Sequence, residues 1–328
     1  MKYWFVIVLV AIGASSFWIL GATHRSREIS VQGEEPLPSR NATSRTKENT
    51  MIFVGDVMLS RSVGALMEQK GDYTFPFLNI ATFLRNADLT FANLENPISS
   101  GGVKVGSIYS FRADPRVVEG LKFAGIDVVS IANNHMWDYG RQAFVDTLYN
   151  LTNAGIGYVG GGYSFAEAHE GITREINGTK VTLLAYTDLL SKQVAATHDA
   201  AGVSFLDVEQ MKRDIALARN KSDIIVVSFH WGEEYQTAHN LKQGHIAKAA
   251  IDAGADLIVG HHPHVAQEVE EYQGRWIAYS LGNFIFDQSF SKATMQGLAL
   301  VVTISDGKIS EVVSQLILIS NSYQAQLP

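Results

Sequence analysis

Five short apolar runs along the chain each end in residues that carry oxygen or nitrogen ligands. They lead into Asp56, into Glu95, into Asn134 and His135, into His230, and into His261, His262 and His264. Runs of this length with polar boundaries predict buried strands. Ligands of open α/β sheets bind just beyond the carboxyl ends of the strands, so we expect these side chains to gather at one edge of a sheet.

Amphipathic stretches lie between these runs. Apolar residues at helical spacing predict helices over 60–69, 76–85, 115–124, 140–154, 207–220 and 243–253, with Asp114 as the N-cap of the third. Asn177-Gly178 and Asp306-Gly307 each separate two apolar runs, which predicts two β-hairpins. We therefore expect an α/β domain with mixed sheets, in which parallel units come first and antiparallel hairpins follow.

The first residues differ from the rest of the chain. Residues 3–22 carry no charge and are numerous enough to cross a bilayer as a helix. A cleaved signal peptide is the alternative, but the run is long for that purpose and has no clear cleavage site. We predict a membrane anchor over 1–23, a polar linker over 24–50, a large α/β body over 51–320 and a tail over 321–328. The arginines that follow the run leave its orientation open.

Composition narrows the possible chemistry. The 328 residues include no cysteine, which excludes disulfides, thiolate metal sites and a cysteine nucleophile. Any metal is therefore held by nitrogen and oxygen ligands, a set that suits Mn, Zn, Fe, Mg or Ca. The net charge of −7, without a basic stripe, argues against a nucleic-acid partner.

Three histidines within four positions, at the end of an apolar run, indicate a metal ion as the group that organises them. We predict one or two divalent ions, held by Asp56, Glu95, Asn134, His230, His261, His262 and His264. Each of these residues alone could equally be a helix cap, a turn residue or a buried histidine. Their recurrence after five separate runs favours a common site.

Four residues near the ends of the runs are candidates for catalysis. His135 is a candidate to protonate a leaving group, and Asp138, three positions later, is a candidate to orient its ring. Glu233 and Glu234 follow His230 and are candidates to orient a ligand or to act as general acid or base. A solvated loop after His230 is the alternative for both glutamates.

Three further residues are candidates for substrate binding. Arg61 and Arg112 could each hold a carboxylate or a phosphate through the planar guanidinium group. Asn283 follows another apolar run and could contact the substrate. A surface position is the alternative for Arg61.

Six motifs taken together resemble the CapA-type poly-γ-glutamate capsule biosynthesis proteins. They are Gly55–Leu59, Asn93–Glu95, Ala132–His135, His230–Gly232, Gly260–His264 and Leu281–Phe284. The resemblance covers most of the chain between residues 51 and 305. That family is similar to the calcineurin-like metallophosphoesterases, which implies a two-sheet sandwich flanked by helices. The resemblance also implies a single-pass protein of the cell membrane with its C-terminal domain outside the cytoplasm.

The sequence departs from the metallophosphoesterase pattern at two positions. Met58 stands where that pattern has a histidine, and Glu95 takes the place of a bridging aspartate. One metal position can thereby lose a ligand, so a one-metal site and a two-metal site both stay open.

The resemblance implies a role in making, anchoring or trimming an anionic γ-linked glutamate polymer, and it leaves three functions open. The first is a metal-dependent hydrolase or transferase that acts on the polymer. The second is a phosphoesterase that uses the same site. The third is a non-catalytic subunit of a polymer synthesis and export complex. The fold alone does not choose between them.

Overall fold

The structure is a computed structural model that describes residues 48–328. The predicted membrane anchor and the predicted linker up to residue 47 lie outside the described residues. In the described part of the chain, none of the helices is both long enough and apolar enough to cross a bilayer.

Within residues 48–328, eight strands form the first sheet. They are β1 (Asn49–Val57), β2 (Leu89–Leu94), β3 (Val128–Ser130), β4 (Gly157–Val159), β13 (Asn283–Ile285), β14 (Gln296–Ser305), β15 (Lys308–Ile319) and β16 (Ala325–Gln326). Their order is β16-β15-β14-β1-β2-β3-β4, with β13 beside the end of β1. The strands β1 to β4 run parallel, whereas β14 to β16 are antiparallel.

Six strands of the described part form the second sheet. They are β6 (Ile172–Ile176), β7 (Thr179–Thr187), β9 (Ile224–His230), β10 (Leu257–His261), β11 (Val269–Tyr272) and β12 (Arg275–Ala278). Their order is β11-β12-β10-β9-β7-β6, and the central strands β7, β9, β10 and β12 are parallel. A short additional pair joins β5 (Gly161–Gly162) and β8 (Gly202–Val203).

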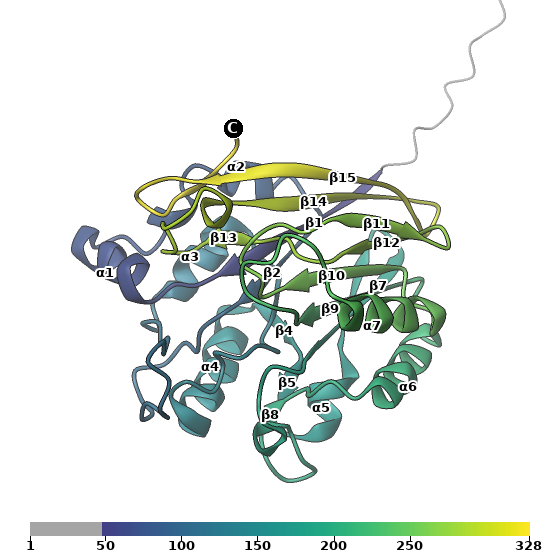
Figure 1. The fold of residues 1–328 in the computed structure, drawn as a ribbon, viewed down its shortest axis with the longest axis horizontal. Helices are drawn as coiled ribbons and strands as arrows, with labels where there is room; N and C mark the ends of the chain where they lie inside the picture. Colours follow the sequence, from purple (N-terminus) through teal and green to yellow (C-terminus); the bar gives the residue numbers. More distant parts are fainter. Residues whose placement is uncertain (1–47) are drawn as a thin grey trace, which may run out of the picture. The chain divides into compact units, whose positions relative to one another are not determined.

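The helices connect and cover these sheets. The α-helices are α1 (Arg61–Lys70), α2 (Ala81–Leu84), α3 (Val117–Ala124), α4 (Gly140–Ala154), α5 (Phe165–Glu170), α6 (Val208–Arg219) and α7 (Leu241–Asp252). Three 3₁₀ turns are η1 (Phe75–Phe77), η2 (Lys192–Val194) and η3 (Ala293–Met295). The helices α1 to α4 pack on the outer face of the first sheet, and α6 and α7 on that of the second (Figure 1).

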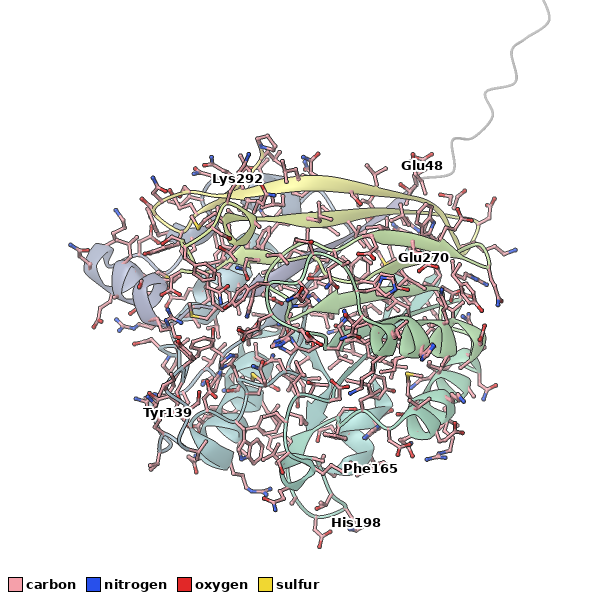
Figure 2. The ribbon with its side chains drawn as sticks, in the orientation of Figure 1. Glu48, Tyr139, Phe165, His198, Glu270 and Lys292 are labelled. Carbon is pink, nitrogen blue, oxygen red and sulfur yellow. The ribbon has the colours of Figure 1, made fainter. Side chains whose placement is uncertain are left out.

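The apolar residues of the central strands alternate between separate cores. Ile52 of β1 packs with the helices of the first sheet, whereas its neighbour Met51 faces the second sheet. In the same way, Val226 of β9 faces the first sheet and Val227 packs with α6 and α7. Successive side chains of a strand point to opposite faces, so both faces of these strands are buried. The predicted two-sheet sandwich flanked by helices is confirmed, and its side chains fill the layers (Figure 2).

Among the predictions for single elements, the two hairpins are confirmed, whereas one helix and two boundaries differ from the structure. Both predicted hairpins are confirmed: Asn177 and Gly178 have φ values of 47° and 91°, and Asp306 and Gly307 have values of 52° and 72°. The continuous helix predicted over 76–85 is wrong, because the chain there forms η1 and the single turn α2. The N-cap residue of α2, Ile80, has a non-helical φ of −123°. Residues 49 and 50, expected in the linker, belong to β1, and residues 325 and 326, expected in a tail, form β16.

Candidate metal centre

Parallel strands of the two sheets bring the polar run ends together. Asp56 of β1 is in register with Asn93 of β2. Glu95 is the first residue after the end of β2. His230 at the end of β9 is in register with His261 at the end of β10. All five of these residues are buried. The side chains predicted from the ends of the apolar runs therefore meet between the facing sheets.

The amide of Asn93 links the members of this cluster. Its Nδ2 atom lies 2.9 Å from Asp56 Oδ1, 3.2 Å from Glu95 Oε2 and 3.3 Å from His230 Nδ1. Asn133 Nδ2 donates to Asn93 Oδ1 at 3.1 Å, which fixes the amide with its nitrogen towards the carboxylates. An amide nitrogen carries two protons, so it cannot donate to all three neighbours. The cluster therefore contains too few hydrogen-bond donors, or too little positive charge, to satisfy its acceptors.

The two buried carboxyl groups have opposite electrostatic surroundings. Burial alone would raise the pKa of Asp56, but His261 Nδ1 at 3.3 Å and His264 Nδ1 at 3.4 Å hold that pKa well below its ordinary value. Burial raises the pKa of Glu95 well above its ordinary value, and the nearby Asp56 carboxylate raises it further. Without a bound cation, Asp56 is thus ionised while Glu95 favours its protonated form.

Two histidines of the cluster, His230 and His262, are held neutral. Burial lowers the pKa of His230 well below its ordinary value, and the nearby His262 ring lowers it further. Burial, followed by the effect of His264, lowers the pKa of His262 to about 3. Neutral imidazole is the form that binds a metal ion.

Several ligand atoms in this cluster have no hydrogen-bond partner within residues 48–328. They are Glu95 Oε1, both ring nitrogens of His261, and His262 Nδ1. A buried polar atom without a partner costs about 1–3 kcal/mol, so four such atoms in one cluster call for a ligand that satisfies them.

Two groups of potential ligand atoms meet the distance requirement for an ion. The first is Asp56, Glu95 and His230, and the second is Glu234, His262 and His264; within each group the atoms lie within 4.8 Å of one another. The rings of His230 and His262 connect the groups, with centroids 4.9 Å apart. The residues therefore fit one or two divalent ions held by nitrogen and oxygen.

The backbone after β10 is held in uncommon conformations. His262 and His264 have φ values of 96° and 58°, in the left-handed region, with Pro263 between them. The His262 N–H donates to Asp56 Oδ2 at 3.3 Å. Such conformations persist where the surroundings over-determine them, and they concentrate at functional sites. Just before them, a Cβ on Gly260 would lie 1.9 Å from Tyr279 O, which explains the glycine.

His135 lies at the edge of the cluster with its ring fixed from both sides. Its Nδ1 atom lies 2.7 Å from Asp138 Oδ2, and Phe111 stacks on the ring with centroids 3.9 Å apart. The Phe111 N–H donates to the same Asp138 oxygen at 2.7 Å. Since Nδ1 donates to Asp138, Nε2 is the atom left to face Glu95 Oε1, 3.8 Å away.

A cavity of about 450 Å³, here named the site cavity, opens onto these residues. Its lining includes Arg61, Asn134, His135, Glu234 and His264. Arg61 Nη2 lies 3.2 Å from Asp287 Oδ1, so the guanidinium is held beside the cavity. Asn134 Oδ1 lies 2.8 Å from His230 Nε2, which ties this residue to the ligand cluster.

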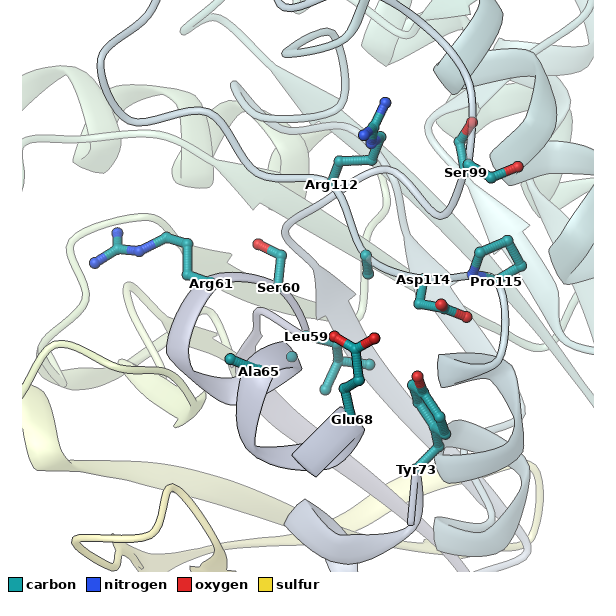
Figure 3. Close-up of a pocket in the computed structure, with 13 residues that line it drawn as sticks. Leu59, Ser60, Arg61, Ala65, Glu68, Tyr73, Ser99, Arg112, Asp114 and Pro115 are labelled. Atoms are coloured by element: carbon teal, nitrogen blue, oxygen red, sulfur yellow. The ribbon is translucent and has the colours of Figure 1, made fainter. Parts of the chain in front are cut away.

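Three predicted site residues lie elsewhere. Arg112 lines a neighbouring cavity (Figure 3), where its guanidinium donates to Gly101 O and lies over the Tyr139 ring. Glu233 lines another cavity, together with Asp188. Asn283 is buried, and its Oδ1 lies 3.0 Å from His264 Nδ1. Asn283 therefore contacts a histidine of the cluster, and its predicted contact with the substrate stays a prediction.

One residue of the cluster, Asn93, had not been predicted as a site residue. Of the two glutamates after His230, Glu234 and not Glu233 lines the site cavity, and the chain turns just before them at Gly232, with a φ of 83°. Asn93 had a sequence signal, since its spacing of two from Glu95 puts both on one face of an extended chain. The Met58 sulfur accepts from Ser60 Oγ at 3.1 Å, and the loss of a metal ligand at this position stays a prediction.

The sequence model of the bacterial capsule synthesis protein PGA_cap matches residues 50–288. The chain belongs to this family. "Capsule biosynthesis protein CapA" of Bacillus anthracis is 36% identical over 252 residues, 74% of this chain and 61% of that protein. "PGA biosynthesis protein CapA" of Bacillus subtilis is 38% identical over 244 residues, 73% of this chain and 64% of that protein. The chain thus spans less than two thirds of the length of these two relatives.

Other similarities are more distant. A "probable polyglutamine synthesis accessory protein" of Mycobacterium tuberculosis is 29% identical over 283 residues, 73% of this chain and 74% of that protein. Among solved structures, the calcineurin-like phosphoesterase YfkN from Bacillus subtilis has a TM-score of 0.48 at 13% identity, with 85% of this chain and 93% of that chain covered. The NAD nucleotidase of Haemophilus influenzae has a TM-score of 0.46 at 11% identity, with 86% and 53% covered.

Proposed function

We propose that this protein is a metal-dependent hydrolase or transferase that acts on poly-γ-glutamate or its precursor during capsule synthesis. In this proposal the N-terminal apolar run anchors the protein in the cell membrane and the described domain works outside the cytoplasm. The names of the CapA relatives support the pathway. The observation that carries the chemistry is the buried group of unpartnered ligand atoms beside the site cavity.

The ligand cluster would hold one or two divalent ions, with Asp56, Glu95 and His230 as one set and Glu234, His262 and His264 as the other. A divalent ion bound there supplies Lewis-acid polarisation of a carbonyl or phosphoryl oxygen. Asn93 keeps the carboxylates of Asp56 and Glu95 in place, and Asn134 does the same for the His230 ring. The side chains are thus oriented before any ligand arrives.

His135 is the group that moves a proton. Asp138 holds its Nδ1 proton, so Nε2 is the atom that takes or gives a proton at the mouth of the ligand cluster. The stacked Phe111 ring excludes water from one face of the imidazole and keeps its plane fixed. This arrangement fits protonation of the leaving group after a bond is cut.

Arg61 is the group that binds the anionic substrate. Its guanidinium stands beside the site cavity and retains donors beyond the one that faces Asp287. A planar guanidinium accepts a carboxylate or a phosphate equally well. The alternative function, a phosphoesterase, therefore rests on the same residue, and a substrate comparison decides between the two.

The test uses the full-length protein. Metal content is measured by mass spectrometry, and turnover is measured with poly-γ-glutamate, by chain length, and with a model phosphodiester. His135→Ala is expected to keep the metal and lose turnover. The matched control His198→Ala, at an exposed position away from the site (Figure 2), is expected to keep both.

The outcomes separate the candidate functions. Metal-dependent shortening of the polymer supports the proposal, and turnover of the phosphodiester alone supports the alternative. Metal binding with turnover of neither substrate would contradict both. That result would favour a non-catalytic subunit of a synthesis and export complex, in line with the name of the mycobacterial relative, an accessory protein.

A further inference from the structure

Exposed apolar side chains surround the mouth of the site cavity. Tyr109, Tyr235 and Phe290 line the cavity while remaining exposed, and Ile108, next to Tyr109, is 82% exposed. The rings of Tyr235 and Phe290 pack edge to face with centroids 5.1 Å apart. These four residues are named the apolar rim. Single exposed apolar residues are ordinary, but a group of them around a polar cavity marks an interaction surface.

The loop that carries half of the rim is anchored at both ends. The Val103 N–H donates to Tyr139 O at 3.2 Å, and the Val105 N–H to Asp138 O at 3.0 Å. At the other end, the Phe111 N–H donates to the Asp138 side chain. Val103 and Val105 are themselves exposed. The loop therefore presents its apolar residues to solvent while its ends are tied to the residues that orient His135.

Two lysines flank the apolar rim, in segments that contain no acidic residue: Lys104 lies in 101–111 and Lys292 in 288–296. Acidic residues adjoin the other parts of the rim, since Glu233 and Glu234 precede Tyr235, and Asp287, which pairs with Arg61, precedes the second segment. Neither lysine pairs with a carboxylate within residues 48–328. Apolar side chains, tyrosines and unpaired lysines together fit the surface of an anionic bilayer. The apolar side chains enter the acyl boundary, the tyrosines lie at the level of the headgroups, and the lysines contact the anionic headgroups.

The length of chain before the domain allows this contact. The rim lies at the carboxyl end of β1, whose nine residues span about 30 Å from the point where the chain enters the sheet. Residues 23–48 separate the apolar run from that point, and a segment of this length reaches up to about 90 Å. A domain tethered by residues 3–22 can therefore turn its site towards the same membrane.

We propose that the apolar rim docks on the lipid surface of an anionic membrane, so that the site cavity opens at the bilayer interface. The inference rests on the proposed function in one respect: the identity of the substrate, an anionic chain that enters the cavity from the membrane. Docking itself depends on the rim and on Lys104 and Lys292. A second protein that covers the rim is the competing occupant, and the test below separates the two.

The chain has no cysteine, so a single introduced cysteine can be labelled with an environment-sensitive fluorophore. The test uses full-length protein with Ile108→Cys or Phe290→Cys, mixed with vesicles of phosphatidylcholine and phosphatidylglycerol. Leu217→Cys on α6 is the matched control, since Leu217 is 65% exposed and Phe290 66%. We expect a blue shift and a several-fold loss of iodide quenching at the two rim positions, and neither change at position 217.

A second measurement tests the role of charge. The double variant Lys104→Gln and Lys292→Gln, and vesicles of phosphatidylcholine alone, are each expected to reduce the blue shift at position 108. Rim labels that stay as accessible to iodide as the Leu217→Cys label in the anionic vesicles would overturn the proposal and leave a protein partner as the occupant. The readout requires no metal and no turnover, so failure of the docking and failure of the proposed function are distinguishable.

Discussion

Replacing Glu95 with glutamine tests the idea that the cluster is built for a cation at the expense of the metal-free fold. Glu95 is fully buried, its Oε2 atom shares the Asn93 amide with Asp56, and its Oε1 atom has no partner in the described residues. Glutamine keeps the shape, removes the charge and adds two donors. We therefore expect Glu95→Gln to stabilise the metal-free protein and to weaken metal binding.

The size of the expected gain in free energy of unfolding follows from Glu95 Oε1, the oxygen that has no hydrogen-bond partner in the described residues. An unsatisfied buried polar group costs about 1–3 kcal/mol, and more when it is charged. In EDTA the variant should gain at least about 1 kcal/mol in free energy of unfolding, or roughly 2–4 °C in melting temperature. With metal at about 100 times its Kd, the wild type gains about 2.7 kcal/mol that the variant lacks, so the order of stability reverses.

The pH dependence has a definite sign. Because the pKa of Glu95 is raised above its ordinary value of 4.5, the folded metal-free protein retains a proton that the unfolded chain has lost. The contribution of Glu95 to stability therefore falls as the pH rises from about 4.5 towards the raised pKa. The advantage of the variant in EDTA should be small below pH 4.5 and should grow above it.

Thermal unfolding with EDTA and with added Mn²⁺, at several pH values, measures these effects. Glu311→Gln, at an exposed position of β15 outside the cluster, serves as a control for removal of a carboxylate at the surface. A Glu95→Gln variant that is less stable than the wild type in EDTA at pH 7 would refute the reasoning, because it would mean that the Glu95 carboxylate stabilises the metal-free fold.

Three further predictions follow from the same geometry. Asp138→Asn removes the carboxylate that holds the imidazole, so turnover should fall by about 10²–10⁴-fold at unchanged metal content. Glu234→Gln should lower metal affinity in calorimetric titrations, whereas the neighbouring Glu233→Gln should leave it unchanged. Gly55→Ala should destabilise by more than the about 1–3 kcal/mol of ordinary overpacking, since its Cβ would lie 2.0 Å from a backbone carbonyl oxygen. Urea unfolding measures this, with Gly101→Ala, which meets only side-chain atoms, as control.

Each prediction has a contrary result. Full turnover by Asp138→Asn would mean that the proton transfer does not need a fixed ring. Equal metal affinity of the Glu234→Gln and Glu233→Gln variants would remove Glu234 from the ligand set. Equal stability of the two glycine variants would show that the backbone at Gly55 can move aside.

The position of the candidate site could be predicted because it depends on local patterns. The apolar run before Asp56 and the run before His261 each predict a strand, and parallel strands bring their carboxyl ends to one edge. The dipeptide Asn177-Gly178 predicts its hairpin for a local reason as well, since both residues tolerate a positive φ. The strands and the hairpin could thus be predicted from the residue types within a few positions of each element.

Other features depend on contacts that no local pattern records. Asn93 links the cluster only because Asp56 and His230 arrive from other strands. The distinction between Glu233 and Glu234 depends on the turn at Gly232, and the place of Arg112 in a neighbouring cavity depends on the Tyr139 ring under its guanidinium. The helix predicted over 76–85 failed for a similar reason: Phe77 and Leu84 reach the core from two separate turns.

Burial is the physical property that connects these observations. It keeps His230 and His262 neutral, it raises the pKa of Glu95, and it leaves four ligand atoms without partners in the described residues. In a solvated loop, water would satisfy the same atoms and none of these effects would arise. A cation satisfies these unpartnered atoms, and it replaces the proton that Glu95 otherwise retains. Stability and metal binding are therefore coupled through Glu95, which is why a single substitution there should move them in opposite directions.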